Sequence, residues 1–174
     1  NIRCANATSY FQSYYFVNCN ARRWANTFFE TTSISFDVHF DAGCMMEAGQ
    51  NALALGLPVA CTVTNSVIEG MSGYAITYKF ARGLTVSGMY FEDNALGDVV
   101  DISDPAGGSY SENVVLFGNY HDAPSYTRYA VVWQNCQNGR SFGSLINRGG
   151  VGHYLINTWH VEIDDRSLLS DVTN

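Results

Sequence analysis

A repeated pattern of short apolar runs restricts the fold of this chain more than any other feature. Residues 85–93 (TVSGMYFED) align with residues 62–70 and 115–122, and residues 11–16 fit the same frame. With Val86 as the anchor, the first series of equivalent positions is Phe11, Ile34, Val63, Val86, Leu116 and Phe142. Self-similarity at a period of about 20–50 residues is typical of solenoids, in which each repeat packs on its neighbours.

A second series of equivalent positions separates the regular strands from the variable loops. It comprises Trp24, Met46, Ile76, Val100, Val131 and Leu155. The step from the first series to the second is 12 to 15 residues, whereas the return step varies from 10 to 17. The variation therefore lies in one connection, and its two long versions, residues 49–58 and 104–109, are irregular or rich in turn-forming residues.

The composition of the repeated runs predicts strands. They are rich in Val, Ile, Tyr, Phe and Thr and are interrupted by Gly and Asn, which is typical of short strands joined by tight bends. Only residues 45–55 have a helical periodicity, so repeats built from helices are excluded. We predict an all-β parallel β-helix of about six rungs over residues 1–158, followed by a cap or linker over 159–174.

Composition and charge exclude several classes of protein. Hydrophobic residues make up 47% of the 174 residues and charged residues 14%, which excludes a disordered chain. The net charge of −7, with no basic cluster larger than Arg22-Arg23, argues against nucleic acid as a partner. No apolar run approaches the roughly 18 residues of a membrane span. The chain starts at Asn1 without Met, so we expect a piece of a longer protein.

Cysteine and histidine spacings argue against a metal centre and against a disulfide framework. The five cysteines form no CxxC pair and are odd in number, so we expect buried free thiols. The four histidines share no spacing that suits zinc, and no Gly-x-Ser-x-Gly motif is present. We therefore expect no metal and no cofactor. His121 beside Asp122 could assist proton transfer or lie on the surface.

Two copies of the repeat resemble a known family. Residues 83–94 (GLTVSGMYFEDN) and 112–120 (ENVVLFGNY) resemble the coil motif of right-handed single-stranded parallel β-helix proteins of the pectate-lyase type. The aromatic-rich coils are most similar to those of bacteriophage tailspike and tail-fibre proteins. This resemblance implies a homotrimer, a location in the virion or otherwise outside the cell, and a bacterial surface polysaccharide as the partner. It does not select an activity, because one fold carries many functions.

A column of carboxylates is the first candidate for catalysis. Side chains at one position of a β-helix stack vertically, and Glu69, Glu92 and Asp122 share such a position. A pair of carboxylates is the catalytic group of most glycoside hydrolases, which separate them by about 5–5.5 Å in retaining enzymes and about 6.5–9.5 Å in inverting ones. The alternative is that these residues end their strands and point apart into water, because a slip of one residue turns every side chain to the other face.

Asp101 is the fourth candidate acid, because it lies within a predicted strand, between Thr77 and Val132 of the second series. Its neighbours Asp98 and Asp104, with Glu112, could hold Ca²⁺, but their spacing matches no known calcium loop, and solvated acids are the alternative.

Aromatic residues supply candidates for substrate binding. Tyr74 and Tyr129 share one predicted column with His153, and Tyr78 and Trp133 share another, so both could form a strip on which sugar rings stack. Packing in the core or at a trimer interface is the alternative. Arg128 is the arginine we select as a partner for acidic sugars, with Arg22, Arg23 and Arg148 as further possibilities.

Three functions follow from these residues and from the resemblance. The first is a tailspike segment that binds and hydrolyses capsule or O-antigen with Glu69, Glu92, Asp101 and Asp122. The second is a trimeric fibre segment that binds a receptor or serves as a shaft without catalysis. The third is a pectate-lyase-like enzyme, which would need a Lys or Arg base, and the single lysine, Lys79, has no stacked acids beside it.

Overall fold

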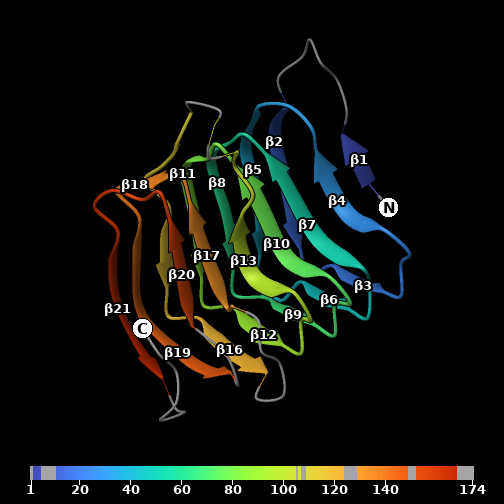
Figure 1. Cartoon of the computed structure of the whole chain (residues 1–174). Helices are drawn as coiled ribbons and strands as arrows, with labels where there is room; N and C mark the ends of the chain where they lie inside the picture. Colours follow the sequence, from blue (N-terminus) through green and yellow to red (C-terminus); the bar gives the residue numbers. More distant parts are fainter. Residues whose placement is uncertain are drawn as a thin grey trace.

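The structure, a computed structural model, is a solenoid built from strands alone over the residues that it describes. These are residues 2–4, 11–104, 106, 109–123, 129–148 and 152–167. Figure 1 shows the strands stacked side by side along one axis, from the blue N-terminal end to the red C-terminal end. The prediction of an all-β parallel solenoid of about six turns is confirmed. Residues 45–55, the only segment with a helical periodicity, contain β6 (Met45–Glu47) and the larger part of β7 (Asn51–Gly56) and no helix.

The strands form three faces, and every strand pairs in parallel with its counterpart in the next turn. The first face comprises β1 (Ile2–Cys4), β4 (Thr27–Thr31), β7 (Asn51–Gly56), β10 (Tyr74–Lys79), β13 (Gly97–Asp101), β17 (Val131–Gln134) and β20 (His153–Ile156). The second comprises β2 (Phe11–Val17), β5 (Ser35–Asp41), β8 (Pro58–Thr64), β11 (Arg82–Ser87), β14 (Ser111–Glu112), β15 (Val115–Phe117), β18 (Cys136–Gln137), the first part of β19 (Arg140–Arg148) and β21 (Glu162–Ser167). The third comprises β3 (Asn20–Arg22), β6 (Met45–Glu47), β9 (Val67–Glu69), β12 (Tyr90–Glu92), β16 (Tyr120–Ala123) and the second part of β19.

Columns of inward side chains form the core. Alternate residues of a strand point to opposite sides, and parallel pairing in register places equivalent residues of successive turns above one another at about 4.8 Å. The inward column of the third face contains Met46, Ile68, Phe91, His121 and Ile146. All five are buried, so the repeat seen in the sequence is the repeat of one continuous core.

Residues in the left-handed conformation make the corner between the second and third faces in each turn. One turn has two of them, Ala42 and Gly43, with φ of 51° and 85°. The other turns have one each, with φ between 49° and 66°, at Asn18, Asn65, Gly88, Gly118 and Gly143. Gly and Asn adopt this conformation more readily than other residues, which explains why they interrupt the repeated runs at fixed places.

The register corrects several of the predicted equivalences. Val63, Val86 and Leu116 are aligned as predicted, but the column continues to Phe16 and Phe40 at one end and Ser141 at the other, in place of Phe11, Ile34 and Phe142. In the second series, Ile76 and Val131 are aligned through Val99 rather than Val100, and the column includes Phe29, Leu53 and His153 instead of Trp24, Met46 and Leu155. The connections between the runs differ in length by several residues, so the spacing of the runs alone does not fix their register to one residue.

The ends of the chain and the cysteines add three observations. Parallel pairing continues past residue 158, because β21 pairs with β19. Cys44, Cys61 and Cys136 are buried free thiols, as predicted, and Cys19 is free and partly exposed. Among the described residues there is no helix of the length and apolarity that crossing a membrane requires.

Candidate functional site

Acidic residues form a ladder on the outer side of the third face. Strands β6, β9, β12 and β16 place Glu47, Glu69, Glu92 and Asp122 in register. The predicted alignment of Glu69, Glu92 and Asp122 is thus the alignment of the structure. Glu47 was missed, because Met46 was assigned to the other series. We call these four residues the acid ladder.

Each end of the acid ladder has a polar partner, a cation at one end and a neutral amide at the other. Arg22 Nε lies 2.8 Å from Glu47 Oε2. At the other end, Asn147 Nδ2 donates a hydrogen bond of 2.9 Å to Asp122 Oδ1. In the centre, partial burial raises the pKa of Glu69, and the carboxylates of Glu47 and Glu92 raise it further. Like charges on neighbouring rungs favour the protonated form of one of them.

This arrangement has the parts of an acid–base pair. A carboxyl group with a raised pKa can donate a proton, while an adjacent ionised carboxylate can act as a base or nucleophile. Adjacent rungs, about 4.8 Å apart, are close to the separation of retaining glycosidases, and alternate rungs are close to that of inverting ones. Tyr90 and Tyr120 stack beside the ladder with ring centroids 5.3 Å apart.

Asp101 lies apart from the acid ladder and faces the core. It pairs with Tyr78, not with Thr77 as predicted, so its side chain points to the inner side. It is 1% exposed, Oδ1 accepts hydrogen bonds from the backbone N–H and hydroxyl of Ser103, and Oδ2 has no hydrogen-bond partner. Burial raises the pKa of Asp101 to about 6. Asp101 borders the outer hollow lined by Tyr74 and Tyr129, but at 1% exposure it presents almost no surface to a polymer there.

Two of the aromatic residues selected for substrate binding are also in the core. Tyr78 and Trp133 are buried side chains of the inner side. Trp133 donates a hydrogen bond of 3.1 Å from Nε1 to His153 Nδ1, and His153 Nε2 lies 2.9 Å from Asp165 Oδ2. The one-residue error in the second series changed the predicted side of Asp101, and the alternative of core packing holds for both aromatic residues.

Tyr74 and Tyr129 line a hollow of about 320 Å³ on the outer side of the first face. Tyr129 stacks on Tyr154, with ring centroids 4.3 Å apart and planes at 7°. The partner of Tyr129 is therefore Tyr154 and not His153. Stacked, partly exposed rings provide the kind of flat apolar surface on which a sugar ring can lie.

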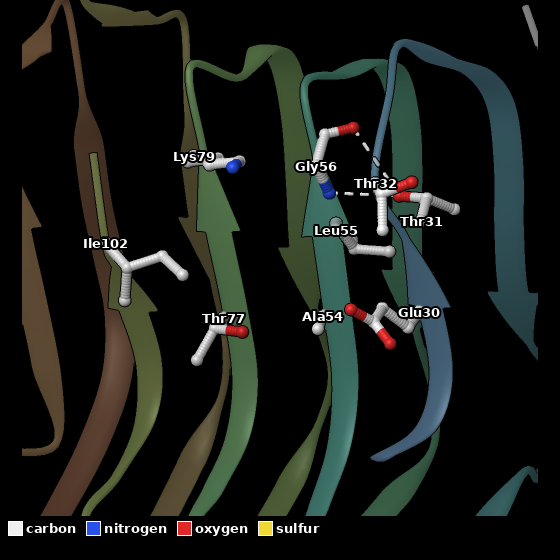
Figure 2. Close-up of a pocket in the computed structure, with 9 residues that line it drawn as sticks. All are labelled: Glu30, Thr31, Thr32, Ala54, Leu55, Gly56, Thr77, Lys79 and Ile102. Atoms are coloured by element: carbon white, nitrogen blue, oxygen red, sulfur yellow. Dashed lines mark hydrogen bonds between the residues drawn. The ribbon is translucent and has the colours of Figure 1, made fainter. Parts of the chain in front are cut away.

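A second hollow, of about 130 Å³, lies farther along the same face. Figure 2 shows the residues that line it on neighbouring strands: Glu30 on β4, Ala54 on β7, and Thr77 and Lys79 on β10. The exposed side chain of Ile102 lines both hollows, which are therefore neighbours on this face. We call the two hollows together the first-face groove. It places one cation, one anion and several hydroxyl groups on the same surface as the tyrosines.

The acid ladder and the first-face groove lie on the two sides of one corner of the solenoid. Glu69 ends β9 and Tyr74 begins β10, five residues later in the chain. Two turns later, Asp122 and Tyr129 stand in the same order along the chain. Tyr78 and Trp133 are core side chains and line neither the ladder nor the groove. Arg128 lies outside the described residues.

His121 is a core residue and does not extend the acid ladder. It is 1% exposed, stacks on Phe91, and its Nδ1 lies 2.9 Å from Asp98 Oδ2. Asp98 is buried too, so it is not one of the solvated acids considered from the sequence, and His121 is not the surface residue considered there. Over the described parts of the chain, no group of three or more His, Cys, Asp or Glu side chains has the arrangement of a metal site.

Comparison with solved structures shows which proteins share this fold. The fold is similar to that of a putative glycosyl hydrolase from Parabacteroides merdae ATCC 43184, with a TM-score of 0.66 over 93% of this chain and 84% of that chain. The two are 10% identical in sequence, so the likeness shows the fold alone. No protein-family model matches the chain, and no curated protein matches it.

Proposed function

We propose that this chain binds a bacterial surface polysaccharide, a capsule or O-antigen, and hydrolyses it at the acid ladder. One observation carries the proposal: Glu69 lies between Glu47 and Glu92, and burial and both neighbours raise its pKa. Glu69 is the general acid. Glu92 or Asp122 is the second carboxylate, which acts as nucleophile or base.

The first-face groove supports a polymer as the ligand. It follows the solenoid axis across several turns, from Glu30 on β4 to Tyr154 on β20. Its tyrosines suit the apolar faces of sugar rings, and its hydroxyl and charged groups suit sugar hydroxyls and acidic substituents. A chain that crosses the corner would contact the groove and the ladder together. The fold that this chain shares with the Parabacteroides protein, named as a glycosyl hydrolase, agrees with this substrate class.

We further propose that the chain is part of a homotrimeric bacteriophage tailspike in the virion. The resemblance of residues 83–94 and 112–120 supports this assignment. A second support is a pair of exposed aromatic rings on the outer side of the second face: Phe117 and Phe142 are 49% and 39% exposed, and their ring centroids lie 4.7 Å apart. Light scattering should give three times the chain mass of 19.2 kDa, and a monomer at all concentrations would contradict the trimer.

Binding without cleavage is the second candidate. The specific observation in its favour is that the stacked tyrosines and the acid ladder lie on different faces. A lyase is less well supported, because Arg22, the basic residue of the ladder, is paired with Glu47 and Lys79 lies in the groove on another face.

The test is hydrolysis of purified capsule and O-antigen polysaccharides, followed by reducing ends and by chain length. Glu69→Gln and Glu92→Gln should each lower the rate at least 100-fold or so, the usual contribution of a positioned acid or base. Glu112→Gln is the matched control, a half-buried carboxylate of β14 outside the ladder. Full activity of both ladder variants would refute the site, and binding without new reducing ends would favour the second candidate.

A further inference from the structure

A second cluster of reactive side chains lies on the outer side of the second face, whereas the acid ladder lies on the third. Strands β2, β5 and β8 place Tyr15, His39 and Thr62 in one outward column. These strands lie side by side in Figure 1. His39 Nε2 is 2.6 Å from Asp37 Oδ1, and His39 Nδ1 is 2.5 Å from Thr62 Oγ1. Each ring nitrogen of His39 is therefore engaged, one with a carboxylate and one with a hydroxyl.

The hydrogen bonds of this cluster determine which ring nitrogen of His39 carries the proton. Asp37 Oδ2 accepts hydrogen bonds from Ser13 Oγ at 3.0 Å and from Tyr15 Oη at 2.9 Å. Bonds from His39, Tyr15 and Ser13 lower the pKa of Asp37, which is thus ionised and only accepts. In the neutral imidazole, Nε2 then carries the proton, and Nδ1 offers its lone pair to the Thr62 hydroxyl.

The backbone conformation of β5 brings the Asp37 carboxylate to the His39 ring. Asp37 has φ of +57°, and the positions equivalent to it in neighbouring turns, Ser13, Ala60 and Gly83, also have positive φ. These left-handed residues form a stacked bulge, and bulges of this kind turn a side chain out of the regular alternation. In this turn the bulge directs Asp37 toward His39, while Tyr15 stacks on the other side of the ring at 4.7 Å. The imidazole is therefore held in one orientation.

From this geometry we propose that Thr62, His39 and Asp37 form a hydrolytic triad that cleaves acyl esters, such as O-acetyl groups on the polysaccharide. A hydroxyl within hydrogen-bond reach of a base, which a third group orients, is the signature of an activated nucleophile. The choice of a glycan ester as substrate rests on the proposed function. The triad itself rests only on the contacts of these three residues.

The reaction that this cluster supports has two balanced steps. Thr62 Oγ1 attacks the acyl carbon while its proton moves to His39 Nδ1, the ester C–O bond breaks, and the leaving alcohol takes that proton. A water molecule then attacks the acyl carbon and gives a proton to Nδ1. The bond to Oγ1 breaks, the free acid leaves, and Thr62 recovers its proton from His39. Asp37 stabilises the imidazolium formed in each step.

The site is open to a substituent carried on a polymer. The side chain of His39 is 21% exposed and that of Asp37 is 43% exposed. Thr62 is half-buried in the outward column, between His39 and Thr85. Thr85 has the same residue type and the same outward position one turn farther along, without the imidazole beside it, and is the matched control for Thr62.

The experiment measures ester hydrolysis with 4-nitrophenyl acetate and with acetylated xylan. Thr62→Val should lower kcat/KM at least 100-fold or so, Thr62→Ser should retain activity, and Thr85→Val should match the wild type. Peptide mass spectrometry after an acid quench should find the acetyl group on Thr62. If Thr62→Val does not fold, as judged by circular dichroism, His39→Gln provides the same readout.

Two outcomes would overturn the triad: equal hydrolysis by the wild type and Thr62→Val, or no hydrolysis of either probe by the wild type. The measurement is separable from the test of the acid ladder. Glu69→Gln should retain ester hydrolysis, and Thr62→Val should retain any cleavage of the polysaccharide chain.

Discussion

Asp101 should make the protein less stable as the pH rises, and the size of the effect follows from its burial. Its pKa is about 6 in the folded state against a reference value of 3.8. Each pKa unit corresponds to about 1.4 kcal/mol, so the difference of about two units corresponds to roughly 3 kcal/mol. The physical cause is the transfer of a carboxylate into the core, where Oδ2 has no hydrogen-bond partner.

The sign of this dependence follows from proton binding. Between pH 3.8 and about 6 the folded state binds more protons at Asp101 than the unfolded state does, so stability falls as the pH rises. The stabilisation is fully present below pH 3.8 and is lost above about pH 6. Asp101→Asn cannot ionise, and this contribution to the pH dependence should disappear.

Urea unfolding from about pH 3 to pH 8 tests the prediction. The free energy of unfolding of the wild type, minus that of Asp101→Asn, should fall by roughly 3 kcal/mol over this range. A change in the free energy of unfolding that the new amide causes equally at every pH does not alter how the difference between the two proteins varies with pH. Asp104→Asn removes an exposed carboxylate and leaves Asp101 in place, so the slope assigned to Asp101 should persist. An identical pH dependence in the wild type and Asp101→Asn would refute the reasoning.

Three further predictions concern the ladder, the backbone and the core. Glu92→Gln removes a charge that raises the pKa of Glu69, so an NMR titration should find that pKa lowered, and an unchanged value would place Glu92 too far away. Gly56→Ala would put a Cβ 2.5 Å from the carbonyl oxygen of Thr31, a backbone atom that cannot rotate away. The substitution should lower the free energy of unfolding by about 1–3 kcal/mol, measured by thermal unfolding. Wild-type stability would show that β4 and β7 are farther apart. Asp98→Ala removes the partner of buried His121 and should cost about 1–3 kcal/mol in urea unfolding, and no loss would mean that the imidazole has another partner.

The acid ladder was predictable because its strands are short and end at clear marks. Glu69, Glu92 and Asp122 each lie four residues after a Gly or Asn corner, at Asn65, Gly88 and Gly118. Because the distance from the corner is the same in each turn, the alignment of these acids cannot shift by one residue. In the second series Gly97 also stands four residues before Asp101, but it is a misleading mark, because the predicted frame aligns it with Gly73 whereas the structure pairs it with Tyr74. This error of one residue exchanged the inner and outer sides of Asp101.

The sequence by itself determined the class of fold. Period-two apolar runs of β-branched and aromatic residues, with Gly or Asn at the corners, can bury their apolar side only by stacking one turn on the next. The tertiary structure alone decided which polar groups meet. Asp37, His39 and Thr62 come from two turns, and a stacked bulge brings the carboxylate to the imidazole. His121 likewise became a core residue because Asp98, 23 residues earlier, accompanies it. Such contacts depend on bulges and register, to which the pattern of apolar residues is insensitive.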